Sequence, residues 1–195
     1  MAAAIILTVT VLMSLSGLWF APRIIERNLF RPYWFMRSRQ YWTAVGSAFV
    51  HADLSHLLFN CLTFWAFAFS LERVIGSPRL LALYAVGVAA SDTGTYFKHR
   101  NNPDYACLGA SGAILAVLFA SIVYFPRQSL FILPIPLPIP APLFAAIYLL
   151  YSFYAARHPH GRINHEAHFY GALAGLAFVA VTDPHAWQRA LSSFR

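Results

Sequence analysis

Residues 109–125 read GASGAILAVLFASIVYF, an apolar run that opens on a serine set between Gly109 and Gly112. Side chains such as those of Ala113–Ala120 partition into lipid, whereas a polar group in a bilayer core is costly and usually marks a function. The run therefore indicates a membrane helix, and Ser111 is a candidate nucleophile at its start.

The composition of the whole chain is that of an integral membrane protein. Hydrophobic residues make up 59% of the 195, and charged residues only 11%, about half the share found in soluble domains. This length predicts a single domain over residues 1–195, with room for about six spans of roughly 20 residues. The net charge is +7, but the arginines lie in short segments between spans, so we expect no nucleic-acid partner. We also expect no cleavable signal peptide, because residues 1–20 lack a basic n-region.

Hydrophobic periodicity predicts an all-α fold, a bundle of six transmembrane helices. The predicted spans cover about residues 3–21, 54–75, 78–97, 109–125, 140–156 and 166–181. The connection over residues 22–53 mixes arginines with Trp and Tyr, which is typical of the membrane–water interface. The run Leu133–Pro142 is expected to be extended, because a proline at every second residue removes backbone donors.

The fourth predicted span is short for a bilayer. Residues 109–125 would measure roughly 25 Å as a helix, against ~30 Å for the hydrocarbon core. With Phe125 at one surface, Ser111 then lies below the other. The first backbone N–H groups of this helix need water or a substrate oxyanion as their partner.

The second predicted span begins with a pair of polar side chains, His56 and Asn60. Their i, i+4 spacing places them on one face of a helix, where both can donate to the same atom. Two uncharged donors of this kind suit an oxyanion hole. The structural alternative is a pair of interhelical polar contacts, which are common between membrane helices.

The last predicted span carries His168 on the same stripe as Gly171 and Gly175. A Gly-xxx-Gly pair lets another helix approach closely, and if that helix is the one that begins near Ser111, the imidazole comes within hydrogen-bonding reach of the hydroxyl. A serine and a histidine suffice for acyl transfer. The alternative is simple helix packing beside a satisfied histidine.

A metal site is the main chemical alternative. Its candidate ligands are His51, His56, His165, His168 and Cys107. However, His165 and His168 are three residues apart, which is not the His-Glu-x-x-His spacing of zinc proteases. We therefore expect neither a metal nor any other cofactor.

Together these residues resemble the rhomboid family of intramembrane serine proteases. The resemblance runs from Trp42 to Gly175 and includes the order and spacing of the motifs. The residues that carry it are His51, His56, Asn60, Glu72, Arg73, Gly76, Gly109, Ala110, Ser111, Gly112, Ala167, His168, Gly171 and Gly175.

The resemblance implies a Ser111–His168 dyad, with an oxyanion hole formed by the Ser111 N–H and the side chains of His56 and Asn60. It also implies cleavage of transmembrane protein substrates near a bilayer surface, without metal or nucleotide. The fifth helix and its loop form a lateral gate in this family, and the matching segments here are 134–142 and 158–165. A catalytically silent relative that binds and escorts membrane helices is the alternative function.

The chain departs from the family pattern at two positions. Many members carry an aromatic residue one turn after the serine, stacked on the imidazole, where this chain has Leu115. Many have Trp-Arg in the first loop, where Trp42 is followed here by Thr43.

The membrane orientation has two conflicting indications. Of the 14 Lys and Arg residues, nine lie in the connections on the serine's side, which favours placing that side in the cytoplasm. The resemblance implies the reverse, a multi-pass protein of a bacterial-type plasma membrane with its site opening to the outer face. We adopt the second, because a long connection that is partly submerged is poorly described by charge counting.

Overall fold

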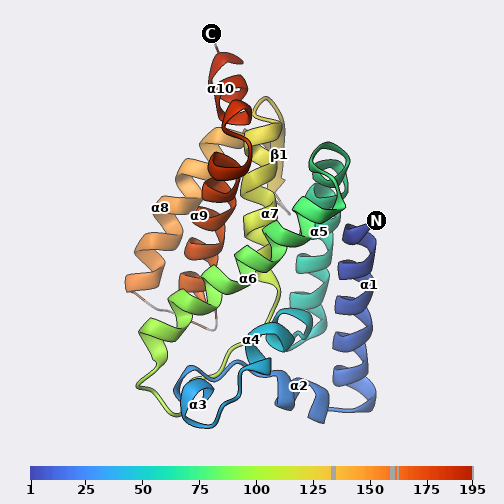
Figure 1. Cartoon of the computed structure of the whole chain (residues 1–195), viewed down its shortest axis with the longest axis vertical. Coiled ribbons are helices and arrows are strands. Elements are labelled where there is room, and N and C mark those ends of the chain that lie inside the picture. Colours follow the sequence, from blue (N-terminus) through green and yellow to red (C-terminus); the bar gives the residue numbers. More distant parts are fainter. Residues whose placement is uncertain (133–134, 159–160, 162, 195) are drawn as a thin grey trace.

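The structure is a computed structural model that describes residues 1–132, 135–158, 161 and 163–194. Its long helices form a bundle, with both chain ends at one end and a set of short helices at the other (Figure 1). The long helices are α1 (Ala2–Leu15), which continues as the π-helical turn η1 (Ser16–Phe20), α5 (Leu54–Ile75), α6 (Ser77–His99), α7 (Ser111–Tyr124), α8 (Ala141–Arg157) and α9 (His165–Thr182). The short elements are α2 (Arg23–Asn28), α3 (Pro32–Arg37), α4 (Trp42–Gly46), the 3-10 turn η2 (Ser47–Phe49) and α10 (Pro184–Ser192).

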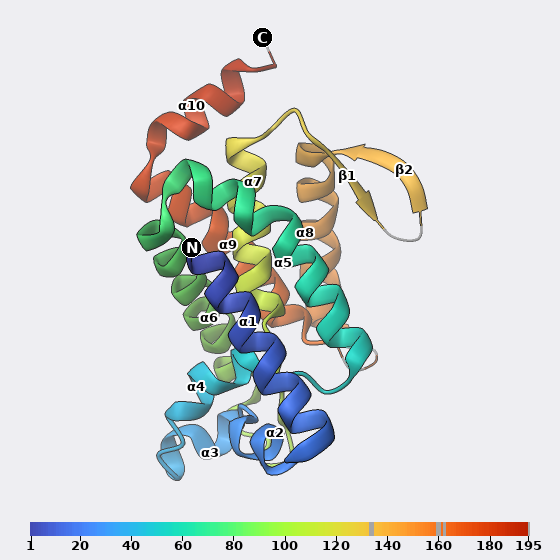
Figure 2. The ribbon, with the colours of Figure 1, turned by 90° about the vertical axis from the view of Figure 1, so that its right-hand side faces the viewer.

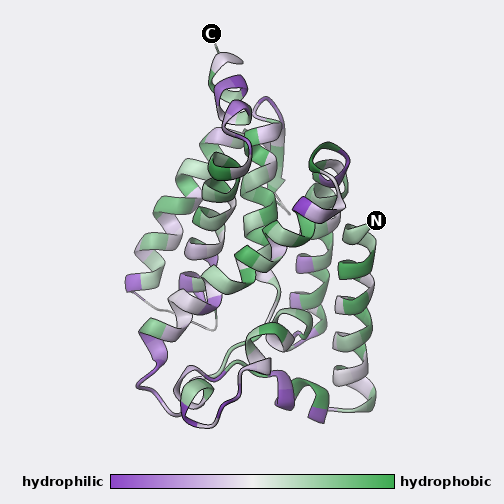
Figure 3. Ribbon diagram, viewed as in Figure 1, coloured by the Kyte–Doolittle hydropathy of each residue, from purple (hydrophilic) through white to green (hydrophobic). Residues whose placement is uncertain are grey.

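Helices occupy all six segments in which spans are predicted, with ends that differ by no more than two residues. Among the described residues, two helical segments are long and apolar enough to cross a bilayer, Ala2–Phe20 with a mean hydropathy of 2.0 and Leu54–Ile75 with 1.5. Hydrophobic residues cover much of the long helices, and hydrophilic ones gather near the short helices and in the C-terminal helix α10 (Figure 3). The predominantly helical fold agrees with the sequence analysis, while the number of membrane crossings stays a prediction.

Helix α7 forms the core of the bundle. All its residues from Gly112 to Val123 are buried, and its neighbours are α5, α6, α8 and α9 (Figure 2). A helix that is apolar all round needs to be covered on every side, either by other protein elements or by lipid. The neighbours of α7 provide that cover, so the serine at its first residue is held by the most enclosed element of the fold.

Helices α7 and α9 touch through their backbones. A Cβ added at Gly171 would lie 2.7 Å from the carbonyl carbon of Gly112, and one at Gly175 would lie 2.8 Å from that of Ala116. On the other side of α7, a Cβ at Gly112 would lie 2.6 Å from the Cβ of Ser91 in α6. The glycine stripe of the last helix therefore faces the helix that begins at the serine, as its spacing predicts.

Side-chain caps fix where two of these helices begin. Oδ1 of Asp53 accepts from the N–H of His56 at 2.8 Å at the start of α5. Oδ1 of Asn164 accepts from the N–H of Ala167 at 3.0 Å at the start of α9. Such caps satisfy donors that helix starts leave unpaired, and both lie at the end of the bundle where α7 starts (Figure 1).

The proline run departs from a purely α-helical fold. It contributes strand β2 (Ile135–Pro140), which pairs antiparallel with β1 (Ser129–Ile132), Leu130 opposite Ile139. Successive residues of a strand direct their N–H groups to opposite edges. Prolines at every second position therefore remove the donors of one edge only, and the other edge keeps all its N–H groups for pairing. The extended conformation is confirmed, and it forms a two-stranded hairpin within a predominantly helical fold. Residues 133 and 134 of this run, and 159, 160 and 162 of the predicted gate loop 158–165, lie outside the described residues.

The contact between α7 and α9 predicts that Gly171→Val destabilises the fold. The new side chain must displace backbone rather than a flexible side chain, so we expect a loss of about 3 kcal/mol in the free energy of unfolding. Denaturant unfolding in detergent micelles measures it. The control is Ala177→Val, at an exposed position of the same helix, and equal stability of the two variants would contradict the close-packing argument.

Candidate active site

The turn before α7 depends on Gly109. Its φ is +117°, a conformation that residues with a side chain rarely adopt, and its N–H donates to the carbonyl of Ser47 at 2.9 Å. A Cβ at this position would lie 2.6 Å from Cε1 of His56. Glycine is therefore required both for the backbone conformation and for the close approach of the imidazole, two residues before Ser111.

Ser111 and His168 are in hydrogen-bonding contact. Nε2 of His168 lies 2.8 Å from Oγ of Ser111. His168 is three residues before Gly171, so it shares the face of α9 that packs on α7. The packing of the two helices thus brings a base within reach of a hydroxyl, the geometry that general-base activation of a serine needs.

Helix α6 holds the start of α9 in place. Nδ2 of Asn164 donates to Oγ1 of Thr95 at 2.9 Å, and Oγ of Ser91 donates to the carbonyl of Ala167 at 3.0 Å. These contacts flank His168 on its N-terminal side. They restrain the turn that carries the imidazole, independently of the glycine contact one turn further on.

Tyr148 is a site residue that the sequence analysis missed. Its hydroxyl lies 3.1 Å from Nδ1 of His168, so the imidazole is contacted at both nitrogens. Leu115, at the position where many rhomboids have an aromatic residue, is buried and apolar. The one signal in the sequence is a tyrosine in the middle of an apolar span, where its hydroxyl needs a partner.

The two predicted oxyanion donors lie on α5 beside the start of α7. The imidazole of His56 faces Gly109, and Asn60 lines a small pocket together with Ala110 and Ile114. Asn60 is 7% exposed, and its Nδ2 has no hydrogen-bond partner among the described residues. Buried donors are normally satisfied, so an unpaired amide here fits a group that is kept for a substrate oxygen.

His51 connects α1 to His56 through contacts of its ring. It is fully buried between η2 and α5, and its Nδ1 lies 3.0 Å from Oγ of Ser14, which donates to the carbonyl of Phe49 at 3.1 Å. Burial lowers the pKa of His51 to about 3, so the ring is neutral. Its ring packs edge-on against His56 with 4.8 Å between centroids, which links α1 to the oxyanion side of the site.

A cavity beside Ser111 has room for water. Its volume is about 30 Å³, and Ser91, Asp92 and Asn164 are among its polar lining residues. A water molecule needs ~10–15 Å³ and two or more polar partners. Oδ2 of Asp92 has no partner among the described residues and is available to accept from a water. Hydrolysis of an acyl intermediate requires such a water close to the nucleophile.

The model of the Rhomboid domain matches residues 38–184, which is most of the chain. The chain belongs to the rhomboid family. Members of this family are integral membrane proteins, and all the described site residues lie inside the matched segment.

Individual relatives match parts of this rhomboid chain at modest identity. It is 28% identical over 171 residues to "Rhomboid protein 1, mitochondrial" of Saccharomyces cerevisiae, covering 83% of the chain and 48% of the relative. It is 32% identical over 96 residues to "Rhomboid protease AarA" of Providencia stuartii, covering 43% and 34%. It is 28% identical over 153 residues to the human "Presenilin-associated rhomboid-like protein, mitochondrial", covering 73% and 38%. The chain thus spans less than half the length of these curated relatives.

The ligands of the metal alternative are not assembled in this rhomboid domain. Within the part of the chain that the structure describes, no three His, Cys, Asp or Glu side chains are close enough to hold a metal ion. Cys107 pairs with Phe30 through two backbone hydrogen bonds of 2.9 and 3.0 Å. Burial raises the pKa of its thiol to about 12, whereas a metal binds the thiolate.

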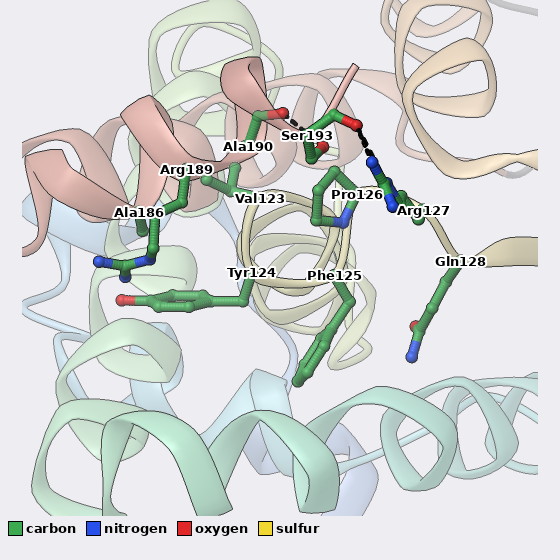
Figure 4. A pocket seen from close by; sticks show the side chains of 10 residues that line it. All are labelled: Val123, Tyr124, Phe125, Pro126, Arg127, Gln128, Ala186, Arg189, Ala190 and Ser193. Atoms are coloured by element: carbon green, nitrogen blue, oxygen red, sulfur yellow. Dashed lines mark hydrogen bonds between the residues drawn. The ribbon is translucent and has the colours of Figure 1, made fainter. Parts of the chain in front are cut away.

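A larger cavity of about 530 Å³ lies at the opposite end of α7, between that helix and α10 (Figure 4). Arg127 donates to the carbonyl of Ser193 at 3.0 Å, and Arg189 pairs with Asp183 at 3.2 Å. The Ser193 hydroxyl donates to the carbonyl of Ala190 at 2.7 Å. Its described lining includes no histidine that could activate this serine, so the smaller cavity at Ser111 remains the candidate site.

Gly109 provides a test of the local geometry. We expect Gly109→Ala to slow the labelling of Ser111 by a fluorophosphonate probe by more than about tenfold, because the new Cβ imposes backbone strain and displaces His56. Gly161→Ala is the matched control: Gly161 also has a positive φ, of 80°, but a Cβ there meets no atom within 4 Å. Equal labelling of the two variants would show that the approach of His56 is unimportant.

Proposed function

We propose that the chain is an intramembrane serine endopeptidase, in which Ser111 and His168 form a catalytic dyad that hydrolyses peptide bonds in or near transmembrane segments of other proteins. The observation that carries the proposal is the 2.8 Å contact between Nε2 of His168 and Oγ of Ser111. Similarity to two bacterial relatives, "Rhomboid protease AarA" and "Rhomboid protease GluP", supports it.

In the proposed acylation step, Oγ of Ser111 attacks the scissile carbonyl carbon while Nε2 of His168 accepts the hydroxyl proton. The carbonyl oxygen becomes an oxyanion, for which the Ser111 N–H and the side chains of His56 and Asn60 are the donors. The tetrahedral intermediate then breaks its C–N bond, and His168 returns the proton to the departing amine.

In the proposed deacylation step, water attacks the acyl-Ser111 ester with His168 as the base. The cavity beside Ser111, with Asp92 and Asn164 in its lining, is a site from which that water can come. The C–O bond of the ester breaks, the second product leaves as a carboxylic acid, and the proton on His168 returns to Ser111.

The surroundings of the dyad fit a substrate that arrives through lipid. Helix α8 exposes a row of large apolar side chains on its outer face: Leu143, Ile147, Leu150 and Tyr151. Helix α7 has 14 residues and is roughly 21 Å long, shorter than the ~30 Å of a hydrocarbon core. We therefore propose a multi-pass protein whose dyad lies below one membrane surface, within reach of a transmembrane segment near its end.

The alternative function is a catalytically silent rhomboid that binds and escorts membrane helices. Such a protein needs no hydrogen bond between a serine and a histidine and no unpaired amide at Asn60. Because both features are present, we favour the protease.

The dyad predicts that Ser111→Ala and His168→Ala each lower cleavage of a reconstituted transmembrane reporter by more than about 10³-fold, since the groups act as a unit. Band intensities in proteoliposomes measure cleavage. Thermal unfolding of Ser111→Ala should match that of the wild type, because one oxygen is removed from beside a cavity.

Two results would overturn the protease. One is equal cleavage by the wild type and Ser111→Ala. The other is loss of cleavage on adding a chelator, which would favour a metallohydrolase. Binding of the reporter without cleavage by the wild type would support the silent alternative.

The oxyanion hole predicts a roughly 10²-fold lower turnover for Asn60→Ala, the effect of removing one such donor. The control is Thr63→Ala on the same helix, where the lost hydroxyl donates to the Phe59 carbonyl of α5 itself at 2.8 Å. Turnover and reporter binding are measured separately. A normal turnover of Asn60→Ala would remove this residue from the oxyanion hole.

A further inference from the structure

The proton on the imidazole of His168 must be on a particular nitrogen for the dyad to work. To accept the proton of Ser111, Nε2 must carry a lone pair, so in the neutral ring the proton is on Nδ1. The hydroxyl oxygen of Tyr148 lies 3.1 Å from Nδ1 and accepts from it in this tautomer. In the other tautomer Nε2 carries the proton and cannot take another from Ser111.

Among the residues that the structure describes, Tyr148 is the one in hydrogen-bonding contact with Nδ1 of His168. Leu115 presents only an alkyl side chain. The imidazole of His165 is 6.1 Å away between ring centroids, too far for a hydrogen bond between the rings. The carboxylate of Glu166, which follows His165 in α9, is paired with Lys98 of α6.

Tyr148 is itself held rigidly. Its ring stacks on Phe144 of the same helix with 5.4 Å between centroids, and it contacts Phe119 of α7 at 5.8 Å. Aromatic neighbours at these distances restrict the ring and stabilise its position. The hydroxyl is therefore presented to His168 at a fixed place rather than on a mobile side chain.

We propose that Tyr148 is a positioning residue for His168: its hydroxyl oxygen accepts the Nδ1–H bond and so fixes both the orientation and the tautomer of the base. The inference rests on the proposed protease function and assigns to a tyrosine of α8 the role that an aromatic residue after the serine would otherwise have. When His168 takes the proton from Ser111, the same bond stabilises the imidazolium, and no proton moves to the tyrosine.

The position of Tyr148 has a consequence for α8 as a whole. This helix is joined to the rest of the bundle near its end by Lys98, which donates to the carbonyl of Ala156. The acceptor at Nδ1 of His168 is therefore in place only while α8 lies against α7 and α9.

The test is Tyr148→Phe, which keeps the ring and removes the hydroxyl. We expect kcat for the reconstituted reporter to fall roughly 10- to 100-fold, the effect of losing a hydrogen bond to a group that becomes charged in the transition state. KM should stay within about twofold, because the lost hydrogen bond is one to the imidazole, which gains its charge only in the transition state. Tyr154→Phe, at an exposed position of the same helix, is the control and should keep the kcat of the wild type.

A second readout separates positioning from general structure. In ¹⁵N-histidine-labelled protein, with His168 assigned by comparison with His168→Ala, the wild type should show Nδ1 protonated and Nε2 unprotonated, and Tyr148→Phe should show a mixture of tautomers. An unchanged tautomer or an unchanged kcat in Tyr148→Phe would overturn the inference. If the wild type does not cleave the reporter, the proposed function fails, and the tautomer measurement still decides whether Tyr148 holds the ring.

Discussion

The backbone contact between α7 and α9 is the constraint on which the rest of the site depends. Gly171 and Gly175 allow the two helices to approach until a single added Cβ would come within 3 Å of the opposite main chain. A hydrogen bond such as the 2.8 Å contact between His168 and Ser111 weakens once the partners separate by a few tenths of an ångström. The interhelical distance that these glycines permit is thus the distance that the proposed chemistry needs, and bulkier residues at this interface would hold the helices apart and leave the serine without a base.

The second requirement is that α9 neither slides nor rotates against α7, which glycine packing alone does not prevent. Helix α6 meets this requirement from the other side, through Ser91 to Ala167 and Thr95 to Asn164. Hydrogen bonds between membrane helices stabilise by about 0.6 kcal/mol each on average, so they add little to the free energy of unfolding. Their contribution is directional: they set the rotation of the first turn of α9 and hence the direction in which His168 points.

The parts of this structure that could be predicted are those encoded by local spacing. Helix positions follow from apolar runs, and the shared face of His168 and the glycines follows from the 3.6-residue period. The sequence predicts only that the proline run is extended. It does not predict the hairpin, because the strand that pairs with the proline run depends on the loop that precedes it. Tyr148 was missed for a similar reason: α8 also carries Tyr151 and Tyr154, and only the tertiary packing singles out the tyrosine whose hydroxyl faces an imidazole.

In the proposed dyad, Tyr148 gives His168 a contact that the alkyl side chain of Leu115 cannot provide. An aromatic ring stacked on an imidazole holds its plane but leaves the ring free to exchange its proton between nitrogens, whereas an acceptor at Nδ1 holds both the plane and the tautomer. The difference also concerns which element carries the constraint. An aromatic residue one turn after Ser111 would sit on the buried core helix α7, while Tyr148 sits on α8, at the edge of the bundle with an apolar outer face. In the proposed protease, alignment of the base therefore depends on the packing of α8 against α7 and α9 as well as on the contact between α7 and α9.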